Sequence, residues 1–343
     1  MAKLFGREWT RAQLLSMVGD LSQIGGVRLS ELSDGSERGV RSADCRTGGG
    51  LSFTVVLDRG MDIGAAEYRG IPLAWISGGG FARPEFHERT DRDWTRTWGG
   101  GLVTGCGLTN VGAAVEDEFG CDGLHGRLSH LPARDASVDG EWEGDEYRFW
   151  VKGRMRQYRV FGENLEMTRV ISARLGDSAF TIDDTVENRG DAASPLMLLY
   201  HINIGFPILS PDSEIVAAPH EVVARDEEAA KGLADWMRFQ EPAAGFAEQV
   251  FRHDIPAGSD GMAEATLCNP WLGVDMRVRF RKAELPFMAE WKMMGKGTYV
   301  VGLEPANSFV SGRVKEREAG RLQMIEPGEK RSFRVEVGVV DRR

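Results

Sequence analysis

The stretch from residue 141 to 190 constrains the fold most, because it is a series of short strand-like runs. It reads EYRFWVKGRM, RQYRVF, LEMTRVISARL and AFTIDDTVEN, punctuated by Gly153, by the turn at 162–164 and by Gly176. Runs this short, at roughly 10-residue spacing with turn signals between them, are typical of an antiparallel sandwich or barrel.

The rest of the chain continues this pattern. In LSFTVVLDRG (51–60) every second residue is apolar, and similar runs recur at 276–282, 297–305 and 331–340. No strand–helix–strand alternation is present, which argues against a doubly wound parallel sheet. Only 10–18, with Thr10 as N-cap, and part of 225–240 have helical character. We predict one all-β domain over 1–343, a large antiparallel β-sandwich with few short helices and a helical N-terminal extension at about residues 1–25.

Charge and composition limit the classes of function. The net charge is −10 and no basic cluster stands out, which argues against nucleic acid and favours a small-molecule ligand. The sequence contains no run of about 18 apolar residues, so we predict no membrane span. The N-terminus also lacks the apolar stretch of a signal peptide. We expect the protein to be located in the cytoplasm. A homodimer is a possibility that the sequence leaves open. The four scattered cysteines are predicted to be reduced thiols that form neither a disulfide frame nor a zinc site: Cys45, Cys106, Cys121 and Cys268.

A polar group interrupts the most apolar run of the chain, PLMLLYHINIGFPIL (195–209). In a strand, Leu199, His201 and Asn203 share one face, and Tyr200 lies on the other. Burial of His201 without a partner would lower its pKa. The residues alone leave two interpretations open, a core histidine held by a backbone carbonyl and a functional imidazole.

A carboxylate stands at the end of another apolar run, TYVVGLEPANS (298–308). Because proline cannot continue a central ladder, we expect the strand to end before Pro305 and Glu304 to lie at its rim. It is then either an ordinary surface glutamate or a partly desolvated carboxyl with a raised pKa, suited to general-base work.

The remaining histidines and the glycine clusters give weaker signals. In GLHGRLS, glycines leave the surroundings of His125 open, and this residue is either a structural hydrogen-bonding group or a functional one. The polar settings of four other histidines predict solvated side chains: His87, His130, His220 and His253. SGGG (77–80) and WGGGLVTGCGLTN (98–110) lack the spacing of phosphate-binding loops, and we interpret them as tight turns near a pocket.

Three segments together resemble the aldose 1-epimerases of the galactose mutarotase-like superfamily, and more narrowly an aldose-epimerase-like branch of unknown function. The Leu-His-Gly segment of that superfamily is matched at His125. A proline six residues before the catalytic histidine is matched by Pro195 and His201, and a late-strand Glu-Pro by Glu304. The resemblance runs from about residue 50 to the C-terminus. It departs where HINIGFP replaces the usual Tyr-Phe-Asn pattern after the histidine, and where the upstream arginine motif is not evident.

The resemblance implies a function and a mechanism. The chain would interconvert the anomers of a reducing sugar, with Glu304 as base, His201 as acid and His125 hydrogen-bonded to substrate, and without a metal or organic cofactor. In this arrangement a carboxylate lies on one side of the sugar ring and an imidazolium on the other. A neighbouring carboxylate favours the charged imidazole and so would offset its desolvation.

Further side chains are candidates for substrate binding, each with a structural alternative. Arg59 and Asp62 of DRGMDIG either clamp hydroxyls or form a surface ion pair, and Asn110 either reaches a pocket or forms a turn. Three others complete the set: Arg127 for an anionic group, Asn203 for a sugar contact, and Trp291 as a flat stacking surface or as core.

Two other classes of function compete with the epimerase. A carbohydrate-binding sandwich without turnover would bind sugars and not accelerate anomer exchange. A metal-dependent sugar isomerase or lyase would use two histidines and a glutamate as ligands, although neither HxH nor HExxH spacing occurs.

Overall fold

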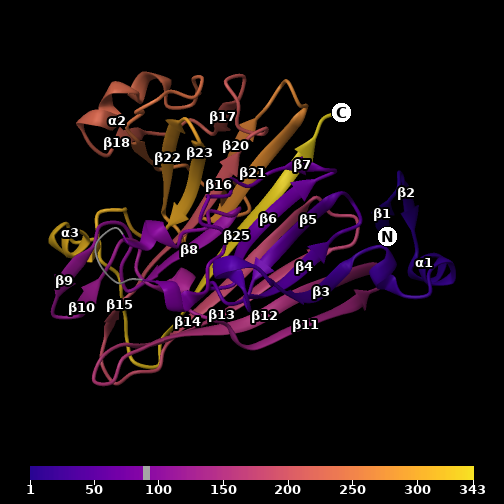
Figure 1. Cartoon of the computed structure of the whole chain (residues 1–343), viewed down its shortest axis with the longest axis horizontal. Coiled ribbons are helices and arrows are strands. Elements are labelled where there is room, and N and C mark those ends of the chain that lie inside the picture. The colour runs from indigo at the N-terminus through magenta and orange to yellow at the C-terminus, as the bar shows by residue number, and fades with distance from the viewer. Residues whose placement is uncertain (88–92) are drawn as a thin grey trace.

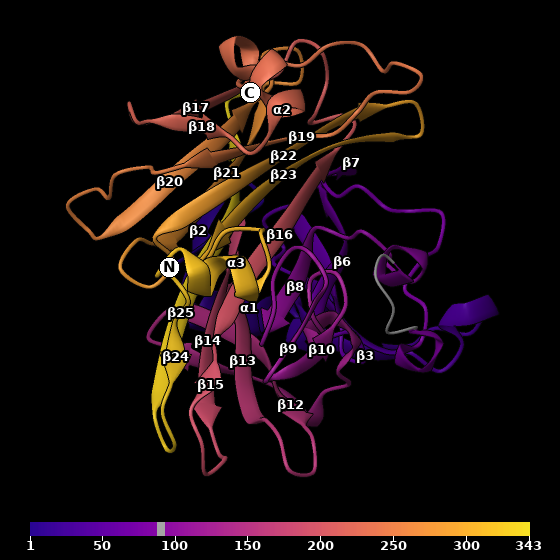
Figure 2. The same cartoon turned by 90° about the vertical axis from the view of Figure 1, so that its left-hand side faces the viewer.

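The computed structural model describes residues 1–87 and 93–343, and two large antiparallel sheets packed face to face dominate it (Figures 1 and 2). The smaller sheet has eight strands in the spatial order β11 (Arg134–Glu143), β12 (Glu146–Tyr158), β13 (Asn164–Arg174), β14 (Ala179–Asn188), β25 (Lys330–Asp341), β21 (Val274–Arg281), β20 (Met262–Cys268) and β17 (Glu214–Ala217). This architecture confirms the predicted all-β sandwich.

The larger sheet has eleven strands, and it carries the functional site described below. Its order is β18 (Val222–Ala224), β19 (Gln249–His253), β22 (Phe287–Gly295), β23 (Thr298–Ala306), β16 (Met197–Gly205), β8 (Val103–Leu108), β6 (Asp62–Tyr68), β5 (Leu51–Val56), β4 (Arg41–Arg46) and β3 (Gly26–Glu31), with β7 (Ile71–Pro72) paired to β6. Its central strands come from distant parts of the chain, since β23 and β8 flank β16.

Short elements decorate the two sheets. The strand pairs are β1 (Ala2–Leu4) with β2 (Arg7–Trp9), β9 (Val115–Asp117) with β10 (Gly120–Asp122), and β15 (Ser194–Pro195) with β24 (Met324–Ile325). The helices are α1 (Arg11–Met17), α2 (Glu227–Lys231) and α3 (Arg313–Glu318), with 3-10 turns at Leu21–Gln23, Gly35–Glu37, Pro84–Phe86, Asp93–Arg96, Leu128–His130 and Leu233–Asp235. In Figure 1, α1 and the β1–β2 hairpin lie at the opposite end of the molecule from α3 and β9–β10.

Two local predictions meet different outcomes. Thr10 caps α1 as expected, in a capping box with Gln13, although the hairpin β1–β2 precedes this helix. The separation of 141–158 at Gly153 is wrong, because β12 runs through it without a turn. A Cβ at Gly153 would lie 2.6 Å from the sulfur of Met61. This glycine therefore permits close packing between the sheets and does not mark a turn.

The main core lies between the sheets, where the rings of Phe53 (β5) and Phe180 (β14) are 4.5 Å apart. Strand β16 divides its side chains as the alternation predicts. Tyr200 faces this core, whereas Leu199 belongs to a second, smaller apolar cluster on the outer face of the larger sheet, together with Trp94 and Trp98.

A buried polar network joins the two sheets behind β16. Arg169 (β13) donates to Asp184 (β14) from Nε at 2.9 Å and Nη2 at 2.7 Å, and Tyr200 Oη donates to the same carboxylate at 2.7 Å. All three side chains are buried. Burial lowers the pKa of Arg169, but the Asp184 carboxylate outweighs this effect and raises it above the ordinary arginine value. Tyr200 thus finds the hydrogen-bond partner that a buried tyrosine needs.

Other features of the chain are simple to place. All four cysteines are free thiols, with Cys45 and Cys106 buried and Cys121 exposed. Within residues 1–87 and 93–343, no helix has the length and apolar character needed to cross a membrane.

Candidate active site

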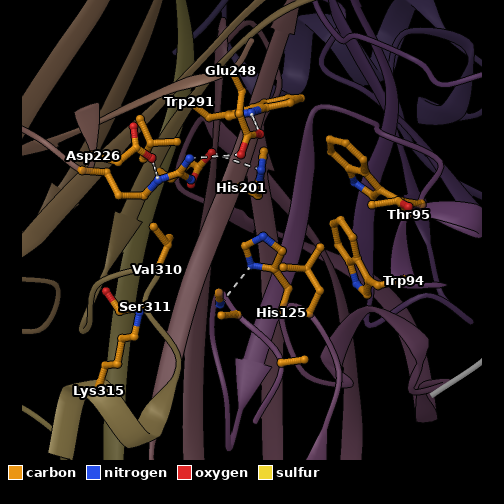
Figure 3. A pocket seen from close by; sticks show the side chains of 18 residues that line it. Trp94, Thr95, His125, His201, Asp226, Glu248, Trp291, Val310, Ser311 and Lys315 are labelled. Atoms are coloured by element: carbon orange, nitrogen blue, oxygen red, sulfur yellow. Dashed lines mark hydrogen bonds and ion pairs between the residues drawn. The ribbon is translucent and has the colours of Figure 1, made fainter. Parts of the chain in front are cut away.

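A pocket of about 630 Å³ opens on the outer face of the larger sheet (Figure 3). Strands β16, β22 and β23 form its base, and loops and α3 form its walls. The lining residues are Trp94, Thr95, Trp98, Gly112, Ala113, Ala114, Leu124, His125, His201, Arg225, Asp226, Glu248, Val250, Trp291, Glu304, Val310, Ser311 and Lys315. It therefore brings together four of the nine predicted site residues: His201, Glu304, His125 and Trp291.

The base of the pocket is formed where the pairing of β16 with β23 is interrupted. Leu199 pairs with Ala306, and Ile202 with Leu303, so this register places His201 directly opposite Glu304. The two intervening positions form no ladder pair. One of them is Pro305, which has no N–H to donate, and the gap accommodates it inside a central strand. The expectation that the strand ends before Pro305 is therefore wrong, and Glu304 lies within the sheet and not at its rim.

His201 and Glu304 lie side by side. His201 Nε2 is 3.1 Å from Glu304 Oε1, and both side chains are nearly inaccessible to solvent. Neither Glu304 Oε1 nor the other ring nitrogen of His201, Nδ1, has a hydrogen-bond partner in the described chain. Since carbon atoms in contact are about 3.5–4.0 Å apart, no sugar ring fits between these groups. The expectation that Glu304 and His201 lie on opposite sides of the sugar ring is therefore wrong. Both groups face a bound sugar from the same side.

Gly302 makes room for the Glu304 carboxyl. It lies two residues earlier on the same face of β23, where a Cβ would be 2.3 Å from Glu304 Oε1 and 3.2 Å from the Cβ of Trp291. Any larger residue would displace the carboxyl. The glycine of GLEP is thus part of the construction of the site.

Burial sets the protonation of the pair. It raises the pKa of the Glu304 carboxyl well above its ordinary value, and Glu248 raises it further, while Arg225 opposes the shift. Burial lowers the pKa of His201, His125 lowers it further, and Asn203 opposes the shift. The expected imidazolium is therefore corrected. The neighbouring carboxyl is itself desolvated, so the two opposite shifts favour a neutral imidazole beside a protonated carboxyl.

His125 projects into the pocket from an unusual backbone conformation. Its φ is +58°, held by hydrogen bonds from His125 N to Gly112 O and from Gly107 N to His125 O. Its Nδ1 accepts from Gly112 N at 3.4 Å, which assigns the proton of the neutral ring to Nε2. Burial lowers the pKa of His125 to about 4. A neutral ring with an Nε2 donor suits a hydrogen bond to a substrate oxygen.

Aromatic rings surround His201. The centroid of its imidazole is 5.2 Å from that of Trp98, 5.4 Å from that of Trp291 and 5.8 Å from that of His125, all edge-on. Trp94 packs on Trp98 at 5.0 Å. These rings fix the imidazole and present flat apolar surface of the kind that ligand pockets offer to a sugar.

Sequence reasoning missed Trp94 and Trp98. The closely spaced tryptophans in the polar, glycine-rich DWTRTWGG (93–100) were the signal that could have found them.

A charged network that sequence reasoning also missed forms the wall beside Trp291. Arg225 donates from Nε to Asp226 at 2.8 Å and from Nη2 to Glu248 at 3.2 Å, and Trp291 Nε1 donates to Glu248 at 2.8 Å. These residues come from loops around β18 and β19, and no local motif marks them. The carboxylate oxygens of Asp226 and Glu248 can accept hydrogen bonds from hydroxyl groups.

Arg59 and Asp62 lie outside the pocket and are buried, which corrects both alternatives given for them. Arg59 donates to the backbone oxygens of Ala82, Thr97 and Ser129. Asp62 accepts from Gly105 N at 2.8 Å, and burial raises its pKa to about 7. Arg59 thus holds loops behind the site, and Asp62 holds strand β8.

Three further candidates also lie outside the pocket lining. Asn110 donates to Ala113 O and Gly123 O and accepts from Arg313 N, so it organises a turn. Asn203 donates to Gly101 O and His201 O. Arg127 forms an ion pair with Asp122 at 3.1 Å. Their predicted contacts with substrate are not consistent with this placement.

Two histidines expected in solvent are buried, which corrects that prediction. His253 lies between His220 and Glu290, with hydrogen bonds of 2.8 and 3.0 Å. His130 lies within 3.1 Å of Arg59 and 3.0 Å of Thr97. Both occur in polar sequence that folds inward, because their ring nitrogens find partners there.

Comparison with solved structures defines the class of fold as galactose mutarotase-like. A protein of Klebsiella pneumoniae described as a candidate aldose 1-epimerase superposes with a TM-score of 0.87 at 23% identity, over 92% of this chain and 83% of that one. A galactose mutarotase-like protein from Clostridium acetobutylicum gives a TM-score of 0.64 at 11% identity, over 92% and 99% of the two chains. Galactose 1-epimerase from Lactobacillus acidophilus gives 0.59 at 11% identity, over 92% and 99%.

The particular family follows from the sequence. Residues 37–339 match the family described as "Domain of unknown function (DUF4432)", and the chain belongs to that family. No curated protein matches it.

Proposed function

We propose that this chain is a sugar 1-epimerase that interconverts the anomers of a reducing sugar by general acid–base catalysis. One observation carries the proposal. Glu304 and His201 lie 3.1 Å apart at the base of an aromatic-walled pocket, with opposite pKa shifts that favour a protonated carboxyl beside a neutral imidazole. The likeness to epimerase structures supports the proposal at the level of the fold.

A single proton on two adjacent groups suits the chemistry of a hemiacetal. Anomer exchange removes a proton from the anomeric hydroxyl and adds one to the ring oxygen, and both oxygens are bonded to the same carbon. Adjacent groups can therefore serve both oxygens from one side of the sugar. The acid and base roles that the resemblance implies are exchanged in this proposal, because burial raises the pKa of Glu304 and lowers that of His201. Glu304 donates its proton to the ring oxygen as His201 accepts one from the hydroxyl, which opens the ring. The reverse transfers close it on the other face of the carbonyl.

Other lining groups would hold the sugar over the pair. His125 Nε2 donates to a substrate oxygen, and Asp226 and Glu248 accept from hydroxyls. The rings of Trp98 and Trp291 exclude water from His201, which preserves the pKa shifts on which the mechanism depends.

Anomer exchange measured directly tests the proposal. We expect the protein to accelerate interconversion of at least one reducing sugar in a panel of aldoses, ketoses, uronates and sugar phosphates, observed by exchange NMR. Saturable binding without acceleration would support the non-catalytic sandwich instead. Activity that chelation abolishes and a divalent cation restores would support the metal-dependent alternative, although no three His, Cys, Asp or Glu side chains of the described chain are arranged to hold a metal.

The pH profile of kcat should lack the acid limb of an ordinary histidine. The pair is active while it holds one proton. Below the pKa of His201 it holds two and has no base, and above the pKa of Glu304 it holds none and has no acid. Because burial lowers the first and raises the second, activity at pH 5.5 should stay within about twofold of that at pH 7. A histidine with the ordinary pKa of about 6.5 would lose about tenfold, and such a loss would contradict the assignment.

A further inference from the structure

Among the described residues, a lysine and an arginine line the pocket, and they differ in their partners. Arg225 is neutralised by Asp226 and Glu248 at 2.8 and 3.2 Å. Lys315 Nζ has neither an ion pair nor a hydrogen bond within residues 1–87 and 93–343. It is exposed on α3 and lies at the rim of the same pocket.

These partners give the pocket two electrically different sides. One arginine with two carboxylates leaves one negative charge beside Trp291, whereas no carboxylate of residues 1–87 and 93–343 pairs with the positive charge of Lys315. Figure 3 places Lys315 and Ser311 on the wall opposite Trp94, away from Glu248 and His201. An anionic substituent is repelled from the first side and attracted to the second.

The wall that carries Lys315 is fixed in place. Arg313, in the first turn of α3, is fully buried and donates to Asp117 from Nε at 3.0 Å and from Nη2 at 2.8 Å, and it also pairs with Asp122. Ser311 Oγ lies on this wall and has no hydrogen-bond partner in the described chain, so it offers a second donor beside the ammonium group.

We propose that the substrate of this site is a sugar acid whose carboxylate binds to Lys315 and Ser311. The inference rests on the proposed function, because it assigns the substrate class of the same pocket. The hydroxyls of the sugar donate to Asp226 and Glu248, so the two sides orient the ring over Glu304 and His201. One unpartnered cation matches a monoanion, whereas a dianionic phosphate would leave its second charge facing the negative side of the pocket.

Binding of matched sugars tests this assignment independently of turnover. Isothermal titration compares glucose with glucuronate, galactose with galacturonate, and glucose with glucose 6-phosphate, each as its equilibrated anomer mixture. We expect at least one uronate to bind about tenfold more tightly than its neutral partner, a preference that salt weakens because Lys315 is exposed. Lys315→Gln should remove the preference, so that a uronate and its neutral partner bind with equal affinity. Lys296→Gln, an equal charge change at an exposed lysine outside the pocket lining, should have no effect.

The outcomes separate this inference from the proposed function. Equal binding within each pair, a preference that survives Lys315→Gln, tighter binding of the phosphate than of the uronate, or no binding at all would each overturn the sugar-acid assignment. Acceleration of neutral-sugar exchange would still uphold the epimerase. Conversely, Lys315-dependent uronate binding without any anomer exchange would uphold the binding site and overturn the epimerase.

Discussion

Glu304→Gln is expected to lower kcat for anomer exchange by about 10²- to 10⁴-fold, the range over which one positioned acid or base acts. The change is nearly isosteric, and it replaces a carboxyl whose pKa burial already raises. Folding should therefore be unaffected, and substrate should still bind. Exchange NMR with a saturating sugar gives kcat, and thermal unfolding together with titration calorimetry confirms that the variant is folded and binds. Retention of more than a tenth of the activity would remove Glu304 from the mechanism.

Two further variants show whether the loss belongs to this carboxyl. Gly302→Ala leaves Glu304 in place, but the new Cβ would lie 2.3 Å from Oε1. The end of a flexible side chain can move aside, so the fold should survive while kcat falls by about 10- to 100-fold. Glu290→Gln is the matched control. Glu290 is equally buried on the adjacent strand β22, but its carboxyl bonds His253 and does not line the pocket. Its replacement should leave kcat within about threefold, and a loss equal to that of Glu304→Gln would indicate general damage.

The faces of β16 were predictable because strand periodicity is local. Alternation alone assigned His201 and Leu199 to one side and Tyr200 to the other, and the two apolar clusters confirm this division. The meeting of His201 with Glu304 was not local, since these residues are far apart in sequence. Only the resemblance to aldose 1-epimerases joined them, and the distance of 3.1 Å then placed them on one side of the substrate.

The errors at Pro305 and Arg59 have a common physical origin. Proline is excluded from a central strand only where the neighbouring strand needs its N–H, and the register of β16 removes that need. Arg59 lies in a polar, turn-like sequence, yet it is buried because three backbone oxygens from distant loops accept its hydrogen bonds. In both cases the deciding partner is remote in sequence, as it is for Arg225 and Glu248 in the pocket wall. Local patterns therefore predicted the strands better than the polar groups around the site.

The largest effect on stability is expected at Asp184. Asp184→Ala leaves the fully buried guanidinium of Arg169 without its closest counter-ion, and Asp62 at 3.8 Å is the remaining one. It also removes the acceptor of Tyr200 Oη. Removing one partner of a buried ion pair typically costs about 3–5 kcal/mol of stability. We therefore expect the free energy of unfolding, measured in urea, to fall by about this amount.

The adjacent residue Asp183 supplies the control for Asp184. On the same strand it points outward and pairs with Arg334 at 2.6 Å, where both side chains are about a third or more exposed (34% and 44%). Asp183→Ala should cost less than about 1 kcal/mol, because solvent screens such a pair. Similar losses for the two variants would show that the buried network contributes no more than a surface ion pair. A much larger loss for Asp184→Ala than for Asp183→Ala would show that the buried network holds the two sheets together behind β16. This is the strand from which His201 reaches the pocket.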